Sequence, residues 1–253
     1  RFLAPLVAAL CVTTVACAHN ETQTARSRSL ADERPPLFAE AGLIVHGLVE
    51  HQGPIGRPSQ LAADISNEEL EPYHSWLMPN FMTPEGAILL TEGGHLLQLN
   101  GKVILIDTGI GRGAEQSPPD PNALFLVGLR GAGIAPEDVD IVVNTHLHVD
   151  HIGWNTFGPG TPTFPNARYK IPRADWDFAQ ANRSTPLFNT VETKVRPLVD
   201  AGLVDFVEGG EVLAAGVRLE RWPGHTPGHQ AVVVERGDLR VSSLETSCII
   251  PHK

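Results

Sequence analysis

The stretch that decides the fold is "VVNTHLHVDHIGW", residues 142–154. An apolar run ends here, and the next few residues place three imidazoles and a carboxylate close together, at His146, His148, Asp150 and His151. Residues i and i+2 of an extended segment point the same way, so His146 and His148 can converge just beyond a strand predicted at Ile141–Val143. Asp150 and His151 then offer a carboxylate and a third imidazole to a neighbouring point, which is what a second ion would need.

This mixture of donor atoms is typical of a metal site. Neutral imidazole with carboxylate oxygen suits zinc, with iron, manganese or cobalt as alternatives. No cysteine lies in the cluster, which excludes a thiolate structural site. Single histidines are usually surface residues or hydrogen-bonded core residues, but a His-x-His-x-Asp-His run is rare by chance. We therefore predict that His146, His148, Asp150 and His151 are metal ligands.

A second histidine cluster lies in "RWPGHTPGHQ", residues 221–230. His225 occupies a turn rich in proline and glycine after a strand predicted at Val217–Trp222, and His229 precedes a strand predicted at Ala231–Val234. Rigid loops at strand ends are where ligands are usefully held. Either histidine could close the first metal site. We prefer His225, at the tip of the turn, and assign His229 a structural role.

Upstream of the first cluster, "AILLTEGGHLLQLNGKVILIDTG" contains β-rich runs separated by Gly-Gly and Asn-Gly. Asn-Gly between apolar runs is a strong hairpin signal. We expect three consecutive antiparallel strands, at Ala87–Thr91, His95–Leu99 and Val103–Asp107.

Helical and strand patterns alternate along the rest of the chain. "PNALFLVGLRGAGIAPEDV" has apolar residues at helical spacing that end near Gly131 and Gly133. After the first histidine cluster, "ARYKIPR", "LVDFVEG", "GVRLERWPGH" and "QAVVVERG" are typical of strands, and "ADWDFAQAN" and "LFNTVETKVRPLVDAG" are typical of helices. Strands with interposed helices predict an α/β sandwich in which helices cover the sheets.

Composition limits the class of partner. The chain has 253 residues, enough for one large domain. Its net charge is −10, and no run rich in lysine or arginine interrupts the acidic balance. Phosphates would be repelled, so nucleic-acid binding is not expected and a small-molecule substrate fits better. The sequence does not indicate the oligomeric state.

The chain begins with "RFLAPLVAALCVTTVACAHN", which is mostly apolar up to Ala16. This run suits the apolar segment of an export signal, so residues 1–18 are expected to be a signal peptide or, with lipid attached at Cys17, a bacterial lipoprotein leader. A buried N-terminal helix is the alternative. Residues 19–36 are predicted to be a flexible linker, and residues 37–253 the domain proper. The protein would then be exported, either periplasmic or anchored to a membrane.

Three motifs together resemble a known superfamily. "HLHVDH", "ILIDTG" and "PGHTPGH", in this order and spacing, resemble the metallo-β-lactamase fold hydrolases. "THLHVDHIGWNT" followed by "PTFPNARY" resembles the branch that includes acyl-homoserine lactonases and methyl-parathion-hydrolase-like enzymes. The resemblance runs from about Gly42 to about Val241 and implies an αββα sandwich with a dinuclear zinc site at one edge.

The same resemblance assigns roles to the site residues. It places the first ion on His146, His148 and His225 and the second partly on Asp150 and His151. Asp107 of "ILIDTG" would orient the metal loop through hydrogen bonds, or simply cap the turn at the end of its strand.

The expected reaction is hydrolysis of a lactone, ester or phosphotriester by a metal-bound hydroxide, which Asp150 can orient. A quorum-signal lactonase is favoured over a phosphotriesterase, and β-lactam hydrolysis is weaker. No Gly-x-Ser-x-Gly motif indicates a serine nucleophile. Four aromatic residues near the motifs could line a substrate pocket, although such residues more often belong to the core: Trp154, Phe157, Phe164 and Trp176.

The tail departs from the family pattern. The family has a Gly-Asp pair whose aspartate bridges both ions, and a further histidine later, whereas this chain reads "GDLRVSSLETSCIIPHK". Glu245 stands where the bridging aspartate is expected, and His252 is too close to replace the later histidine. We expect a truncation or a one-base frameshift near Val241, which would leave the C-terminal part of the sandwich incomplete. The competing hypothesis is a non-catalytic or inactive metal-binding protein.

Overall fold

The computed structural model describes five segments of the chain: residues 36–40, 42–58, 67–236, 239–245 and 248–252. The predicted leader and nearly all of the predicted linker lie outside these residues. Among the helices described here, none is long and apolar enough to cross a membrane.

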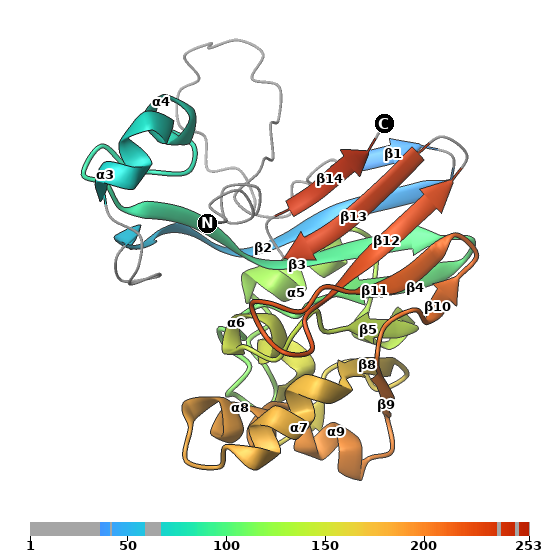
Figure 1. Cartoon of the computed structure of the whole chain (residues 1–253). Coiled ribbons are helices and arrows are strands. Elements are labelled where there is room, and N and C mark those ends of the chain that lie inside the picture. Colours follow the sequence, from blue (N-terminus) through green and yellow to red (C-terminus); the bar gives the residue numbers. More distant parts are fainter. Residues whose placement is uncertain (1–35, 41, 59–66, 237–238, 246–247, 253) are drawn as a thin grey trace.

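A seven-stranded mixed sheet forms the centre of the fold (Figure 1). In spatial order its strands are β1 (Phe38–Glu40), β2 (Leu43–Gly56), β3 (Ile88–Leu99), β4 (Lys102–Ile106), β5 (Ile141–Val143), β8 (Arg168–Pro172) and β9 (Val204–Val207). The strands from β1 to β4 pair antiparallel, and those from β4 to β9 pair parallel. The carboxyl ends of β4, β5 and β8 therefore meet at one edge, which is where open α/β sheets hold their ligands.

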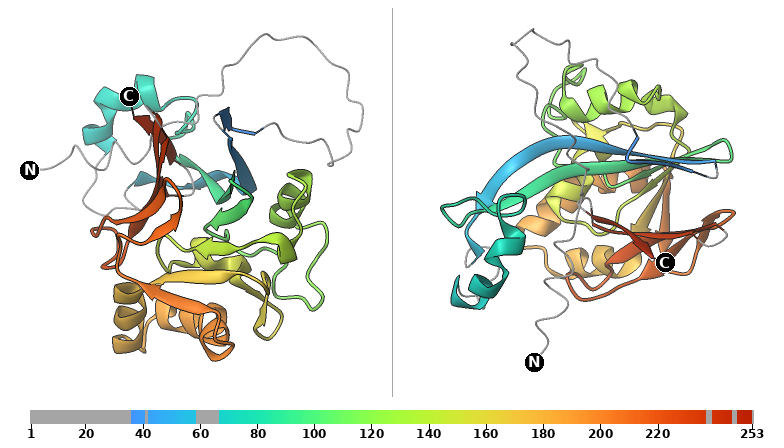
Figure 2. Two further views of the ribbon diagram at one scale, coloured as in Figure 1. Left: turned by 90° about the vertical axis from the view of Figure 1, so that its right-hand side faces the viewer. Right: turned by 90° about the horizontal axis from the view of Figure 1, so that it is seen from above.

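A second sheet is an antiparallel meander of five strands. These are β10 (Val212–Ala214), β11 (Val217–Arg221), β12 (Gln230–Arg236), β13 (Leu239–Glu245) and β14 (Cys248–His252). Its inner face packs on the first sheet (Figure 2). A small ribbon, β6 (Thr156–Phe157) with β7 (Thr161–Pro162), lies apart from both. Glu245 ends β13, and its side chain lies outside the part of the chain that the structure describes.

The predicted hairpin turn at Asn100–Gly101 is confirmed, but the prediction of a turn at Gly93–Gly94 is wrong. Asn100 and Gly101 have φ values of 52° and 74°, as a two-residue turn between β3 and β4 requires. Gly93 and Gly94 instead lie inside β3, which pairs with β2 from Leu99 back to Ile88. A Cβ at Gly93 would clash with the backbone of β2, and one at Gly94 would clash with the backbone of Asp107. These glycines permit close approach of neighbouring strands and do not reverse the chain.

The larger helices cover the outer face of the seven-stranded sheet. They are α5 (Leu124–Gly131), α7 (Arg173–Ala181), α8 (Pro186–Lys194) and α9 (Arg196–Asp200), with the one-turn helix α6 (Val149–Ile152) at the edge of the sheet. Short helices α3 (Asn67–Leu70) and α4 (His74–Leu77) lie between β2 and β3, and the 3-10 turns are η1 (Glu71–Tyr73), η2 (Pro136–Asp138) and η3 (Gly153–Asn155).

The sequence predicted one helix where α8 and α9 now stand. The helix breaks at Val195 because Pro197 has no N–H to donate and its ring collides with the carbonyl four residues earlier.

Two apolar cores lie on opposite faces of the seven-stranded sheet. Leu105 of β4 faces the helices, whereas its neighbours Ile104 and Ile106 face the second sheet. The α/β fold class is confirmed, and the described residues account for three of the four layers of the predicted αββα order. All four aromatic residues proposed as alternative pocket residues lie in or against the helix-side core, which confirms the core interpretation: Trp154, Phe157, Phe164 and Trp176.

Candidate metal centre

The candidate site lies where segments distant in the sequence meet at the sheet edge. Asp107 follows β4, and the residues from Asn144 to Asp150 follow β5. The turn that carries His225 joins β11 to β12 in the other sheet. Gln230 connects this turn to the segment after β5. Its backbone N–H donates to the carbonyl of Thr145 and its side chain donates to the carbonyl of Asn144, both at 2.9 Å. The buried Gln230 thus holds the His225 turn over the first histidine cluster.

Three histidines converge on one point. The ligand atoms of His146, His148 and His225 all lie within 4.8 Å of one another. Nε2 of His146 is 3.1 Å from Nδ1 of His148, which is 3.0 Å from Nε2 of His225. The three rings stand nearly perpendicular to each other, at 84–87°. The predicted convergence of His146 with His148, and the choice of His225 to join them, agree with this placement.

The geometry fits a zinc ion better than a set of hydrogen bonds. Two nitrogens bound to one tetrahedral zinc lie roughly 3.3 Å apart, because the zinc–nitrogen distance is about 2.0–2.1 Å. The separations around His148 are close to this value. Nδ1 of His148 faces Nε2 of both His146 and His225, but it carries at most one proton and so cannot donate a hydrogen bond to both. An ion that accepts all three lone pairs satisfies them together.

Asp107 supports this site through hydrogen bonds to Thr145 and His151. Its buried carboxylate accepts hydrogen bonds from the amide N–H and the hydroxyl of Thr145, both at 2.7 Å, and from Nδ1 of His151 at 2.8 Å. The Thr145 hydroxyl can in turn accept a hydrogen bond from Nδ1 of His146, 3.1 Å away. Both imidazoles are thereby fixed with Nδ1 protonated and Nε2 turned toward the site. The predicted orienting contact from Asp107 is present, and sequence reasoning missed Thr145 as its intermediary.

Asp150 and His151 face a neighbouring point. Nε2 of His151 lies 3.4 Å from Oδ2 of Asp150, and the rings of His146 and His151 have their centroids 3.9 Å apart. Within the described residues, only the three-histidine group brings three ligand atoms together. The structure therefore supplies Asp150 and His151 as a pair beside that group, and their role as ligands of a second ion stays a prediction.

The histidines differ in protonation for physical reasons. Burial lowers the pKa of His146 well below its usual range, and charge on the neighbouring histidines lowers it further. Burial also lowers the pKa of His148, with help from His225. Burial alone would lower the pKa of His151, but the charge and hydrogen bond of Asp107, aided by Asp150, raise it to about 10. At neutral pH, His146 and His148 are thus neutral and each offers a lone pair, while His151 carries a proton on both ring nitrogens.

His229 is placed differently from His225. Its Nδ1 lies 3.1 Å from the carbonyl oxygen of Trp222, so the ring closes the turn between β11 and β12. The ring centroid is 5.3 Å from that of His146, beyond the tight three-histidine group. This position agrees with the structural role predicted for His229.

The turn that carries His225 is anchored by Asp175, at the start of α7. The buried Asp175 carboxylate accepts hydrogen bonds from the Thr226 hydroxyl at 2.8 Å and from the Gly228 amide at 2.6 Å. A Cβ at Gly228 would lie 2.8 Å from the Asp175 amide nitrogen, so glycine is required at this close approach. No sequence signal distinguished Asp175 from an ordinary helix carboxylate.

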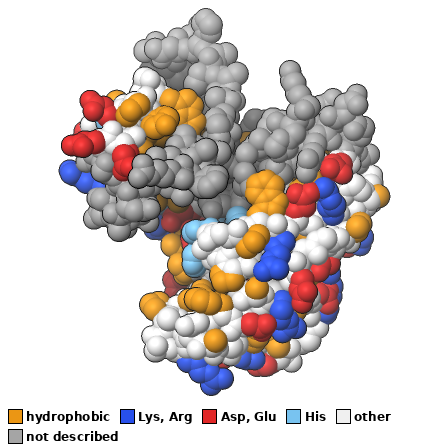
Figure 3. All heavy atoms as spheres, viewed as in Figure 1, with side chains coloured by type: hydrophobic (Ala, Val, Ile, Leu, Met, Phe, Trp, Pro, Cys, Tyr) orange, Lys and Arg blue, Asp and Glu red, His pale blue; other side chains and the backbone are white. Residues whose placement is uncertain are grey.

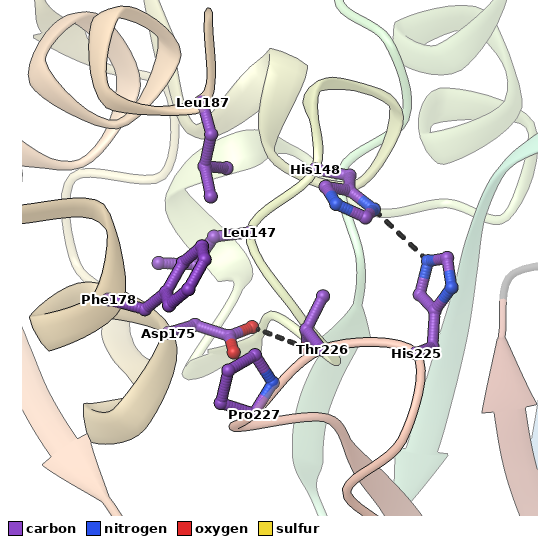
Figure 4. A pocket seen from close by; sticks show the side chains of 8 residues that line it. All are labelled: Leu147, His148, Asp175, Phe178, Leu187, His225, Thr226 and Pro227. Atoms are coloured by element: carbon purple, nitrogen blue, oxygen red, sulfur yellow. Dashed lines mark hydrogen bonds between the residues drawn. The ribbon is translucent and has the colours of Figure 1, made fainter. Parts of the chain in front are cut away.

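A small cavity of about 120 Å³ opens beside the three-histidine group. It is lined by Leu147, His148, Asp175, Phe178, Leu187, His225, Thr226 and Pro227. In the close-up view, Leu147, Phe178 and Leu187 lie on one side and the facing His148 and His225 on the other (Figure 4). Histidine side chains also reach the surface beside hydrophobic side chains in the space-filling view (Figure 3). The cavity has room for an apolar part of a small ligand next to the site.

The chain matches a model of a known protein family. The model of the Metallo-beta-lactamase superfamily matches residues 95–241, which is more than half of the chain. An N-acyl homoserine lactonase of Bacillus sp. is 28% identical over 169 residues, a match that covers 61% of this chain and 62% of the lactonase. The chain thus spans less than two thirds of the length of this relative.

Solved structures show the same fold at lower identity. The hydrolase AbOPH of the beta lactamase superfamily superposes with a TM-score of 0.66 and 21% identity, covering 82% of this chain and 72% of that one. AidC, a dizinc quorum-quenching lactonase solved in complex with a product, N-hexanoyl-L-homoserine, has a TM-score of 0.62 and 22% identity. That match covers 79% of this chain and 69% of AidC.

Proposed function

Because the chain belongs to the metallo-β-lactamase superfamily, as its motifs predicted, we propose that it is a metal-dependent hydrolase of a small lactone or ester. The observation that carries this proposal is the convergence of His146, His148 and His225 within 4.8 Å, beside the pair formed by Asp150 and His151. We propose that the three histidines hold one zinc ion and that Asp150 and His151 contribute to a second, with manganese, iron or cobalt as substitutes.

Bound ions of this kind lower the pKa of a water molecule to near neutrality and polarise the oxygen of the group under attack. The protein's own residues supply position and charge. Asp107 holds the Nδ1 proton of His151, Thr145 holds that of His146, and Gln230 holds the His225 turn next to both residues.

Asp150 is the proposed catalytic residue. Although burial alone would raise its pKa, the hydrogen bond and charge of His151 hold the pKa of Asp150 below its ordinary value, so it is ionised at neutral pH. An ionised carboxylate at the edge of the site can accept a hydrogen bond from the attacking water and orient it. It can also take up a proton from the attacking water and pass it to the oxygen of the leaving group as that group departs.

The substrate class is proposed from the cavity and the relatives together. Leu147, Phe178 and Leu187 present apolar surface next to His148 and His225. This arrangement suits a substrate that joins a hydrolysable carbonyl to an apolar chain. The Bacillus relative is named an N-acyl homoserine lactonase, and AidC was solved with an acyl homoserine product. N-acyl homoserine lactones are therefore the first substrates to test, followed by aryl esters and phosphotriesters.

The alternative is an inactive metal-binding protein. Glu245 ends β13, and the sequence resemblance predicts the bridging aspartate of the family at this position. A site without a suitable bridging carboxylate would hold one ion tightly at most. This alternative predicts a different metal content from the hydrolase.

Metal content and turnover test the proposal together. The chain is loaded with zinc, manganese or cobalt, its metal content is measured by mass spectrometry, and acyl homoserine lactones, aryl esters and dialkyl aryl phosphotriesters are assayed. Asp150→Asn serves as the inactive variant and Asp140→Asn, at a carboxylate paired with Lys102 away from the site, as its control.

The outcomes separate the two hypotheses. Two ions per chain, with turnover that Asp150→Asn abolishes and Asp140→Asn preserves, would support the hydrolase. One ion and no turnover of any substrate would support the inactive protein. Two bound ions without any turnover would exclude the proposed substrate classes.

A further inference from the structure

Glu50, on β2, has an unusual set of hydrogen bonds for a carboxylate of a sheet strand. Its Oε2 accepts from the amide N–H of Ile110 at 2.7 Å and of Gly111 at 3.2 Å. Its Oε1 accepts from the amide N–H of Arg112 and from the indole N–H of Trp154, the latter at 3.1 Å. Three consecutive backbone amides and one indole thus converge on a single carboxylate.

Glu50 is 3% exposed, so this charge is held away from water. A buried carboxylate is costly unless its oxygens are fully hydrogen-bonded. The donors around Glu50 meet that requirement, and they come from two segments, residues 110–112 and Trp154. Glu50 therefore couples a loop that follows Asp107 to a turn that follows His151.

The same two segments are joined by backbone contacts. The amide of Thr108 donates to the carbonyl of His151, and the amide of Gly153 donates to the carbonyl of Gly109, both at 2.8 Å. A Cβ at Gly111 would lie 2.6 Å from the carbonyl oxygen of Gly153, and a Cβ at Gly109 would clash with the Glu50 carboxylate. The segments are therefore in close backbone contact, and Glu50 joins them again through residues 110–112 and Trp154.

We propose that Glu50 is a positioning residue of the candidate metal site: by binding residues 110–112 and Trp154 together, it holds Asp107 and His151 at hydrogen-bonding distance. Glu50 contacts neither residue itself. The inference rests on the proposed function only in that His151 is taken to face a metal ion. The effect on the Asp107–His151 contact is a property of the metal-free protein as well.

The test removes the carboxylate and then returns it. Glu50→Ala leaves four N–H donors facing a void large enough for a small carboxylate, so formate can be added to refill it, with chloride at equal ionic strength as the comparison. Glu50→Gln is the milder variant, because it keeps the size of the side chain but turns an amide N–H toward backbone donors. Val45→Ala, on the same strand but in the other core, is the matched control for loss of stability.

Two measurements report on position. In the metal-free protein, the imidazole N–H resonance of His151 and amide exchange at residues 110–112 are followed by NMR. In protein loaded with cobalt chloride, the visible spectrum and cobalt affinity report on the site. We expect Glu50→Ala to weaken the more loosely held cobalt by about 10–100-fold, the range seen when supporting hydrogen bonds of metal ligands are removed, and formate to restore part of it.

Some outcomes overturn the proposal. If Glu50→Ala and Glu50→Gln loosen residues 110–112 but leave the His151 resonance and cobalt binding as in Val45→Ala, then Glu50 merely stabilises a loop. Wild-type protein that binds no cobalt would instead refute the proposed function, while the His151 resonance would still decide whether Glu50 positions that residue.

Discussion

Oδ2 of Asp107 lies 2.8 Å from Nδ1 of His151, with both side chains buried at the carboxyl ends of β4 and β5. This contact keeps Nδ1 of His151 protonated, and Nε2 faces Asp150. A residue far upstream of the histidine motif therefore sets how one member of that motif can bind an ion.

Asp107→Asn should weaken metal binding without unfolding the protein. The amide can still occupy the space and accept from Thr145, but it no longer offers a charged acceptor to Nδ1 of His151. Loss of such supporting contacts typically costs about 10–100-fold in metal affinity. Competition with a chromophoric chelator measures the change. An affinity equal to that of wild type would show that Asp107 only caps its turn.

Zinc affinity should rise with pH. The raised pKa of His151, about 10, means that both of its ring nitrogens are protonated in the metal-free protein at neutral pH, and an ion bound at Nε2 must displace the proton there. Affinity should therefore increase by up to about tenfold per pH unit and level off near pH 10. Chelator competition between pH 6.5 and 8.5 gives the slope, and calorimetry in two buffers of different ionisation enthalpy counts the protons released. A flat profile would contradict this assignment of the proton.

His225→Ala and His229→Ala should have opposite consequences. His225 is exposed and joins the three-histidine group, so its loss should lower zinc affinity by at least about 100-fold with little change in folding. His229 is buried and closes the turn through the Trp222 carbonyl, so its loss should lower the melting temperature more than it lowers affinity. Metal titration and thermal melting of both variants separate the roles. Equal loss of zinc in both would mean that His229 is also a ligand.

His95, buried in β3, should make the metal-free protein less stable in acid. Burial lowers the pKa of His95 to about 4, although the charge of Asp107 opposes the shift. Between pH 6.5 and 4 the unfolded chain takes up a proton that the folded chain does not. The free energy of unfolding should therefore fall by up to about 3 kcal/mol across that interval and change little from this source below pH 4.

The matched variant for that prediction is His95→Leu. It removes the titrating ring and a buried Nδ1 that has no hydrogen-bond partner among the described residues. Urea unfolding from pH 4 to pH 7 should show a flatter profile in the variant than in the wild type. Parallel profiles would show that other groups cause the acid sensitivity.

Phe178→Ala should change substrate preference more than stability. The Phe178 side chain is 46% exposed and lines the cavity beside His148 and His225, so its removal leaves no buried void. If the apolar chain of the substrate packs there, KM should rise several-fold for a hexanoyl homoserine lactone and little for an acetyl one. Leu124→Ala, at an equally exposed apolar side chain of α5, is the control. An equal change for both chain lengths would place the apolar chain elsewhere.

Patterns that act over short distances in the sequence predicted most of this molecule. The strand at Ile141–Val143, the Asn100–Gly101 hairpin and the convergence of His146 with His148 all follow from backbone geometry within a few residues. The prediction of a turn at Gly93–Gly94 was wrong because a glycine pair can occur either in a turn or where strands pack closely. Only the contacts with the neighbouring strands distinguish these two structures.

What the sequence could not predict depends on contacts between distant segments. Asp175 and Gln230 each hold a loop of the candidate site from another part of the fold, and Glu50 holds the segments that follow Asp107 and His151. Nothing in their local sequence distinguishes them from ordinary strand or helix residues. The predicted leader at residues 1–18 lies outside the described residues, and export stays a prediction.

The crowding of His146, His148, Asp150 and His151 into one short segment also matters before the protein folds. If these groups bind an ion as proposed, they can do so while the chain is still disordered, whereas Asp107 joins only when β4 has paired with β5 and His225 only when the second sheet has packed. Zinc would then bind the denatured ensemble as well as the native one, and would stabilise the fold by less than its native affinity alone would give. Metal acquisition and folding would thus be linked from the start of synthesis: the ion would enter through one local segment, and docking of the second sheet would complete its enclosure.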